Sequence, residues 1–153
     1  MPIRKVEEIC VFNNGVYYPQ ITDGHVPTNS SIGKTHGKAY HGINRRLYHG
    51  GDTTRYPTNI LDFKCVDNYS RVHSSQKPVE LIEYLIKTYT NEGDSVLDNC
   101  AGSFMTAVAC DNLNRKWICI EKEKDYCEIG LQRINENRLK LNIPLLDRVV
   151  CYE

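Results

Sequence analysis

The stretch that decides the fold reads Ser95-Val96-Leu97-Asp98-Asn99-Cys100-Ala101-Gly102-Ser103. We expect a short buried strand over 95–98, a turn of small residues, and a helix from about Phe104. An acid that closes a strand, followed by a glycine turn and a helix start, is how α/β proteins build nucleotide pockets. The glycine lets the backbone approach a ligand, and the helix N-terminus offers unpaired N–H groups. The alternative is an ordinary strand–turn–helix unit without a ligand.

A second apolar strand is expected over 116–120 and ends in Glu121. This acid lies 23 residues beyond Asp98. The spacing suits a carboxylate that accepts hydrogen bonds from ribose hydroxyls, about 20 residues beyond a glycine turn. The order strand–helix–strand–helix from residue 95 onward predicts right-handed crossover units on a parallel sheet.

Two further helices are expected on either side of this unit. The first follows Pro78 and carries an apolar stripe at helical spacing up to Tyr89. The second should have Asp125 as its cap, with Glu128 as the capping-box partner, and should end before Pro144. Additional strands are predicted at 7–12, 16–18, 58–63 and 148–152.

Length and composition favour one intracellular domain. The chain has 153 residues and seven cysteines, without a Cys-x-x-Cys pair. We find no signal peptide and no apolar run near the ~18 residues that span a membrane. Reduced, mostly buried thiols are therefore expected, with a zinc site as the alternative.

Charge is unevenly distributed, although the formal net charge is zero. Residues 1–77 hold ten Lys/Arg against six Asp/Glu, and residues 20–56 lack any periodicity. This irregular stretch is basic and contains glycine and tyrosine, as is typical of segments that bind a phosphate backbone. A solvated loop is the alternative. The candidate nucleic-acid-binding residues are Lys34, Lys38, Arg45, Arg46 and Arg55.

Three segments together resemble a known family. They are Arg-Tyr-Pro-Thr-Asn-Ile-Leu at 55–61, His-Ser-Ser-Gln-Lys-Pro-Val-Glu-Leu at 73–81 and Val-Leu-Asp-Asn-Cys-Ala-Gly-Ser at 96–103. The resemblance is to the C-terminal half of β-group S-adenosylmethionine-dependent DNA methyltransferases, which modify exocyclic amino groups of adenine or cytosine. It implies an α/β fold with a partial Rossmann-like methyltransferase sheet. Residues 73–153 would form the cofactor-binding core, and 1–72 a hairpin and an irregular DNA-recognition segment.

The resemblance implies S-adenosylmethionine as cofactor, double-stranded DNA as partner, and a cytoplasmic protein of bacterial, phage or viral origin. Glu121 would hold the ribose. The family usually has Gly-Ser-Gly-Thr-Thr where this chain has Gly-Ser-Phe-Met-Thr at 102–106. We therefore expect Phe104 and Met105 to impair the methionine pocket, and Phe104→Gly with Met105→Thr to raise cofactor affinity. The residues implied at the methionine end are His73, Ser74, Ser75, Gln76, Lys77, Asp98, Asn99, Cys100, Ala101, Gly102 and Ser103.

The family's catalytic tetrapeptide, Asp-Pro-Pro-Tyr or a close variant, is not found in this sequence, since no two of its six prolines are adjacent. No residue can be nominated as catalytic. The resemblance thus implies a site-specific DNA methyltransferase, with adenine as the favoured target. Its catalytic half would come from a second polypeptide, with a homodimer as the other arrangement. The alternative function is a non-catalytic derivative that binds nucleic acid or protein.

Overall fold

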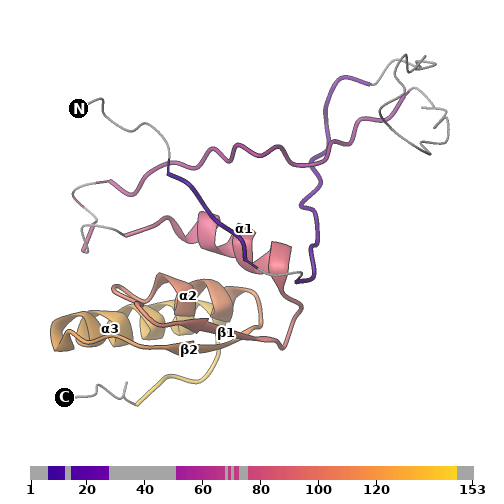
Figure 1. The fold of residues 1–153 in the computed structure, drawn as a ribbon. Coiled ribbons are helices and arrows are strands. Elements are labelled where there is room, and N and C mark those ends of the chain that lie inside the picture. The colour runs from indigo at the N-terminus through magenta and orange to yellow at the C-terminus, as the bar shows by residue number, and fades with distance from the viewer. Residues whose placement is uncertain are drawn as a thin grey trace, which may run out of the picture. The chain divides into compact units, whose positions relative to one another are not determined.

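The structure is a computed structural model that describes residues 7–12, 15–27, 51–67, 69, 71–72 and 76–147. The chain divides into two compact units. One is Pro19–Asp62, and the other combines Met1–Tyr18 with Phe63–Glu153. We call the second the α/β unit, because it contains all the helices and strands of the described residues. Figure 1 labels these elements in chain order.

A two-stranded parallel sheet lies at the centre of the α/β unit, with β1 at Ser95–Asp98 and β2 at Lys116–Cys119. The register pairs Leu97 with Ile118 and places the two strand ends side by side. Parallel neighbours need a crossover connection, and α2 (Met105–Asn112) supplies it. The predicted strand–helix–strand order and the α/β class are therefore confirmed.

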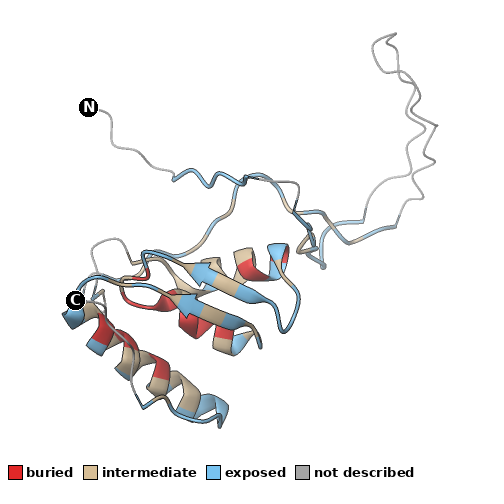
Figure 2. Ribbon diagram, turned by 60° about the horizontal axis from the view of Figure 1, so that its bottom comes forward, coloured by how far each residue is buried: buried red, intermediate tan, exposed pale blue. Residues whose placement is uncertain are grey.

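Helix α2 is the most buried element, because it contacts α1 (Val79–Tyr89), β2 and α3 (Lys124–Leu141). The fully buried side chains between α2 and α3 include Phe104 and Ile134. Figure 2 shows this core as red bands on the helices. The alanines of α2 allow its neighbours to approach closely, so a short helix can serve three contacts.

The two outer helices agree with the predicted spans, but the start of α3 differs. Pro78 precedes α1 as its N-cap. The N-cap of α3 is Glu123, and no side-chain capping hydrogen bond is formed there. The expected capping box of Asp125 and Glu128 is thus wrong. Asp125 lies within the first turn of α3. Its carboxylate interacts favourably there with the positive end of the helix dipole, but it does not cap the helix.

Three predicted strands are not formed: residues 7–12, 16–18 and 58–63 carry no strand in the structure. Residues 7–12 are all exposed. Apolar runs form a strand only where a neighbouring strand completes the hydrogen-bond ladder, and a local sequence pattern cannot supply that neighbour. The predicted strand at 148–152 lies outside the described residues.

One face of the sheet is covered by α2, whereas the other presents apolar side chains to solvent. Leu97 and Ile118, paired in register, are 64% and 58% exposed, and Ile120 follows at 47%. Figure 2 shows pale-blue exposed bands on both strands. Parallel sheets are normally covered on both faces. The described residues therefore leave an apolar sheet face without its second layer.

No helix among the described residues combines the length and the apolar character needed to cross a membrane.

Candidate functional site

The candidate site lies where the two parallel strands end. The N–H of Ile120 donates to the carbonyl of Asp98 at 2.8 Å, and the N–H of Ala101 donates to the carbonyl of Ile120 at 3.0 Å. One step further, the N–H of Gly102 donates to Oε2 of Glu121 at 2.6 Å. The glycine turn and the strand-end acid, predicted separately from the sequence, are thus joined by direct hydrogen bonds.

The Glu121 carboxylate is held by main-chain donors on both of its oxygens. Oε1 accepts the N–H groups of Lys122 at 2.8 Å and Glu123 at 2.9 Å, and Oε2 accepts Gly102. A carboxylate that accepts several backbone N–H groups is fixed in one orientation. Such a preorganised acceptor, on a half-buried side chain at a strand end, fits the hydroxyls of a nucleoside.

Asp98 organises the other side of the turn. Its Oδ1 accepts the N–H of Cys100 at 3.1 Å, and its Oδ2 accepts the hydroxyl of Thr106 at 2.6 Å. The carboxylate therefore connects the end of β1 to the first turn of α2. Sequence reasoning missed Thr106. The signal was present, because Thr106 coincides with the last threonine of the family's usual run.

Phe104 does not have the role that the sequence predicted. The residue is left-handed, with φ 59° and ψ 31°, so a glycine-like conformation is indeed required there. Its side chain, however, is fully buried in the core instead of facing a ligand. The ring packs on Gly130 of α3, where an added Cβ would lie 2.3 Å from Phe104 Cδ2. The expected intrusion of Phe104 on the methionine pocket is therefore wrong, because Gly130 leaves room for the ring elsewhere.

The second suspected residue, Met105, is also part of the core. It is 7% exposed and belongs to the same buried cluster as Phe104. Its sulfur lies 3.9 Å from Nε2 of Gln76, a predicted site residue. Replacing both Phe104 and Met105 by smaller residues would remove core packing, so the expected gain in cofactor affinity loses its steric basis.

Arg133 is a second residue that the sequence did not reveal. Its Nη1 donates to the carbonyl of Ser103 at 2.8 Å. Burial lowers the pKa of the guanidinium, which nevertheless stays charged at neutral pH. Ser103 itself is only 3% exposed, and Ala101 is 8% exposed. The side chains of these two nominated residues are therefore buried, and their predicted role at the methionine end stays a prediction.

The remaining nominated site residues fall into two groups. Gln76 accepts the N–H of Val72 at 3.1 Å, and Lys77 forms an ion pair with Glu7 at 2.5 Å. Asn99 and Cys100 are exposed beside the turn. The structure thus brings Asp98–Ser103 together with Glu121. Gln76 is connected to this turn indirectly, through its contact with the sulfur of Met105. The predicted residues His73, Ser74 and Ser75 lie outside the described residues.

Within the Pro19–Asp62 unit, two segments are connected by an antiparallel bridge between Thr22 and Arg55. The Arg55 guanidinium donates to the carbonyls of Val26, Asp52 and Thr54 at 2.6–3.0 Å. Arg55 therefore links the two segments by hydrogen bonds. Its predicted contact with nucleic acid stays a prediction, and Lys34, Lys38, Arg45 and Arg46 lie outside the described residues.

Carboxylates support the same bridge. Asp23 Oδ1 accepts the hydroxyl of Thr53 at 2.7 Å, and Asp52 Oδ1 accepts the hydroxyl of Thr54 at 2.6 Å. These hydrogen bonds lower the pKa of both carboxyl groups. The hydrogen bonds within this unit therefore favour the charged carboxylates of Asp23 and Asp52.

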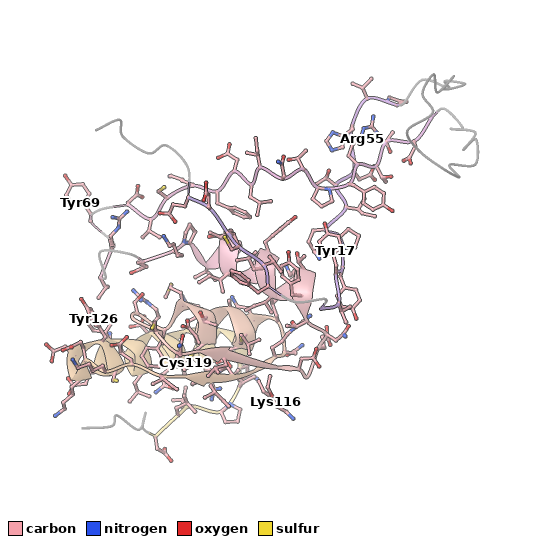
Figure 3. All side chains as sticks on the ribbon, in the orientation of Figure 1. Tyr17, Arg55, Tyr69, Lys116, Cys119 and Tyr126 are labelled. Atoms are coloured by element: carbon pink, nitrogen blue, oxygen red, sulfur yellow. The ribbon has the colours of Figure 1, made fainter. Side chains whose placement is uncertain are left out.

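The cysteines of the described residues do not assemble a metal site, and no cluster of His, Cys, Asp and Glu in that part of the chain could hold an ion. Burial raises the pKa of Cys110 to about 11 and that of Cys119 to about 12. Cys119 lies on β2, labelled in Figure 3. Zinc requires thiolates, so these two thiols behave as apolar core residues.

Sequence comparison decides the family. The profile described as "DNA methylase" matches residues 3–132, which is most of the chain and includes both ends of the candidate site. The chain belongs to this DNA methylase family. The match also covers the Pro19–Asp62 unit.

Individual relatives match shorter parts of the chain. The DNA adenine methyltransferase YhdJ of Escherichia coli (strain K12) is 39% identical over 85 residues, covering 53% of this chain and 29% of that protein. The type II methyltransferase M2.DpnII of Streptococcus pneumoniae is 39% identical over 71 residues, covering 46% and 26%. The crystal structure of an M1.HpyAVI–SAM complex shares 40% identity, covers 46% of this chain and 34% of that chain, and superposes with a TM-score of 0.43.

The chain corresponds to only a fraction of these relatives. The matched parts amount to 25–39% of the length of the relatives at the sequence level. The family match thus applies to residues 3–132 of this chain.

Proposed function

We propose that this chain is the cofactor-binding and DNA-binding portion of a DNA methyltransferase that uses S-adenosylmethionine. The hydrogen bond between Gly102 and Glu121 carries the proposal, because it joins a glycine turn to a fixed strand-end carboxylate. S-adenosylmethionine, when bound, supplies an electrophilic methyl group on a sulfonium. Glu121 would accept hydrogen bonds from the ribose, and the backbone of the Asp98–Ser103 turn would lie at the methionine end.

Adenine is the target that we favour. Support comes from the 39% identity with a protein named as a DNA adenine methyltransferase. The reaction needs acceptors for the hydrogens of the amino group and an aromatic ring for the flipped base. The Asp-Pro-Pro-Tyr segment that would supply them is not found among the 153 residues.

We infer that protein elements outside these 153 residues complete the catalytic half. The exposed face formed by Leu97, Ile118 and Ile120 supports this inference, since a second layer would bury it. Elements that add parallel strands and helices would also cover the free edges of the two-stranded sheet. A complementary polypeptide with an apolar surface is the expected partner, and a second copy of this chain is the other outcome.

Calorimetry with S-adenosylmethionine tests the cofactor part. We expect Glu121→Gln to weaken binding roughly ten- to a hundredfold, because hydrogen bonds to a charged acceptor contribute about 1.5–3 kcal/mol. Glu128→Gln, on the exposed surface of α3, is the matched control and should bind as the unchanged chain does. A chain that does not bind S-adenosylmethionine, yet binds DNA in a salt-dependent way, would instead be a non-catalytic binding protein.

Co-expression tests the partner part. The polypeptide encoded beside this chain should carry the proline-proline tetrapeptide, and the purified complex should methylate adenine in double-stranded DNA. Introducing Asp at both Leu97 and Ile118 should prevent the complex from forming while leaving the α2-side core intact. A stable homodimer that is active alone would replace the heteromeric arrangement.

A further inference from the structure

Two residues that are each unfavourable in their own setting meet between α2 and α3. Phe104 has a left-handed backbone, which side chains other than glycine rarely adopt. Gly130 lies inside α3, where glycine weakens a helix. The Phe104 ring fills the space of the missing side chain, since a Cβ on residue 130 would lie 2.3 Å from Cδ2 and 2.6 Å from Cγ. Each residue therefore accounts for the other.

A second contact joins the same helix to the preceding residue. Arg133 lies three positions after Gly130, on the same side of α3, and donates to the Ser103 carbonyl at 2.8 Å. Because Ser103 is almost fully buried, its carbonyl depends on such a donor within the protein. Helix α3 thus contacts two consecutive residues, 103 through Arg133 and 104 through Gly130.

The residue just before them is also tied to the start of this helix. Gly102 donates to Glu121, whose other oxygen accepts the N–H groups of Lys122 and Glu123 immediately before α3. Residues 102, 103 and 104 are consequently held by Glu121, Arg133 and Gly130, respectively. The turn cannot change conformation without moving against α3 at two points and against Glu121, which precedes the helix, at a third.

We propose that Phe104, Gly130 and Arg133 are positioning residues that set the Gly102–Ser103 turn for the methionine end of S-adenosylmethionine. The inference rests on the proposed function. It assigns to the buried Phe104 ring the conformational control that a glycine cannot exert. A glycine at this position would allow the left-handed turn, whereas the Phe104–Gly130 contact enforces it.

The test compares two ligands, S-adenosylmethionine and adenosine, on the 153-residue chain by calorimetry. In Gly130→Ala, the new Cβ displaces the ring and shifts the turn. We expect the affinity for S-adenosylmethionine to fall roughly ten- to a hundredfold, because a displaced turn would lose a hydrogen bond to the charged methionine end, and the loss of one such bond has an effect of about this size. The affinity for adenosine, which depends on Glu121, should stay within about twofold.

Two further variants separate positioning from damage to the fold. The double variant Phe104→Gly/Gly130→Ala removes the collision but also the ring that enforces the turn. It should therefore recover only part of the affinity for S-adenosylmethionine, and the loss that remains measures the control exerted by the ring. Arg133→Met keeps the aliphatic part of the side chain but removes the hydrogen-bond donor. It should weaken the binding of S-adenosylmethionine but not the binding of adenosine. Gly15→Ala is the matched control, since nothing lies within 4 Å of the added Cβ.

Different results overturn different statements. If the unchanged chain binds both ligands and Gly130→Ala affects neither, or affects both equally without recovery in the double variant, the positioning role is wrong and the proposed function stands. If Arg133→Met leaves S-adenosylmethionine binding unchanged, Arg133 has no part in positioning. If the unchanged chain binds neither ligand, the proposed function is wrong, and the positioning role falls with it.

Discussion

The interactions that stabilise the α/β unit internally differ from those that stabilise the Pro19–Asp62 unit internally. In the α/β unit, fully buried residues such as Phe104, Ala107 and Ile134 form a continuous core. In the Pro19–Asp62 unit, none of the described residues is buried, and hydrogen bonds between exposed polar groups connect its two segments. Burial of apolar groups stabilises strongly, whereas exposed hydrogen bonds compete with water.

This difference also separates what each unit can do. A buried core fixes distances, and the α/β unit accordingly places Gly102 against Glu121 with a 2.6 Å hydrogen bond. An exposed hydrogen-bonded bridge fixes only its immediate neighbourhood. The comparison predicts that equal chemical changes will have large effects in the first unit and small ones in the second.

The largest effect is expected for Asp111→Ala. Asp111 and Arg138 form a two-point ion pair at 2.6 and 3.1 Å with side-chain exposures of 5% and 16%, and Asp111 also accepts the Trp117 indole N–H at 2.9 Å. Removing one partner of a buried pair leaves a charge unpaired, so the free energy of unfolding should fall by about 3–5 kcal/mol. Urea unfolding followed by the fluorescence of Trp117 measures it.

Glu128→Ala is the control for that experiment. Glu128 forms an exposed pair with Lys124 at 4.0 Å on α3, a contact that contributes about 0.5 kcal/mol or less. Equal losses in the two variants would mean that the Asp111–Arg138 pair is as solvated as a surface pair, and the contrast between core and surface would fail.

Thiol chemistry offers a second contrast, between a partly buried cysteine that packs against the core and an exposed one. Burial raises the pKa of Cys119 from its ordinary value of 9.0 to about 12, which lowers the thiolate fraction at pH 8 roughly a thousandfold. Cys100 is exposed in the turn. Alkylation followed by mass spectrometry should modify Cys100 at similar rates in the native and urea-unfolded chain, and Cys119 only after unfolding.

The sign of the pH dependence follows from the same shift. Below about pH 9 the Cys119 thiol is protonated in both the folded and the unfolded chain, so it does not alter stability. Above that pH the unfolded chain ionises first, and stability is lost as the pH rises toward about 12. Native Cys119 that reacts as fast as Cys100 at pH 8 would contradict the burial.

The third prediction concerns the left-handed Phe104. Both Phe104→Ala and Phe104→Gly lose the buried ring, but only glycine relieves the left-handed backbone, whose cost is about 1–2 kcal/mol. The glycine variant should therefore be the more stable of the two by about that amount, as measured by urea unfolding.

Ala107, in the helical interior of α2, gives the control with the opposite sign. There Ala107→Gly should destabilise by about 0.5–1 kcal/mol, because a helical residue gains nothing from glycine. If glycine is also the worse residue at position 104, the left-handed conformation does not carry the expected strain.

How far the sequence determined the structure follows the same division. The α/β order, the turn after Asp98 and the position of Glu121 were predictable, because each follows from a local pattern of strand, turn and helix. The ring of Phe104 was misplaced because its environment depends on Gly130, 26 residues away. Arg133 was invisible for the same reason, since its acceptor at Ser103 is a main-chain carbonyl with no sequence signature.

Irregular segments failed in another way. Residues 7–12 and 58–63 contain the apolar residues typical of strands, but the described structure forms no strand in either segment, and residues 7–12 are all exposed. An apolar run indicates a strand only when one face of the strand is buried, and neither segment contributes to the buried clusters of the α/β unit. Periodicity therefore predicts well where a core exists and poorly where it does not.

The smallest effect on global stability is expected for Arg55→Ala. Its guanidinium joins the two segments of the Pro19–Asp62 unit through main-chain carbonyls, so its loss should speed chymotrypsin cleavage within that unit about 2- to 10-fold. The unfolding of the α/β unit, followed by Trp117 fluorescence, should change by less than about 0.5 kcal/mol. Lys64→Ala, an exposed change in the α/β unit, should alter neither quantity.

Arg55 also decides between two kinds of basic residue. Removing a phosphate contact lowers the slope of log affinity against log salt concentration by about one unit. Removing a residue that only links two protein segments lowers the affinity without that change in slope. If Arg55→Ala weakens DNA binding with an unchanged salt slope, Arg55 acts by shaping its unit through Val26, Asp52 and Thr54. If the slope falls by one unit while cleavage is unaltered, its guanidinium leaves these carbonyls for DNA. The contrast between the two units then becomes one between a fixed core and a surface that exchanges internal hydrogen bonds for a ligand's.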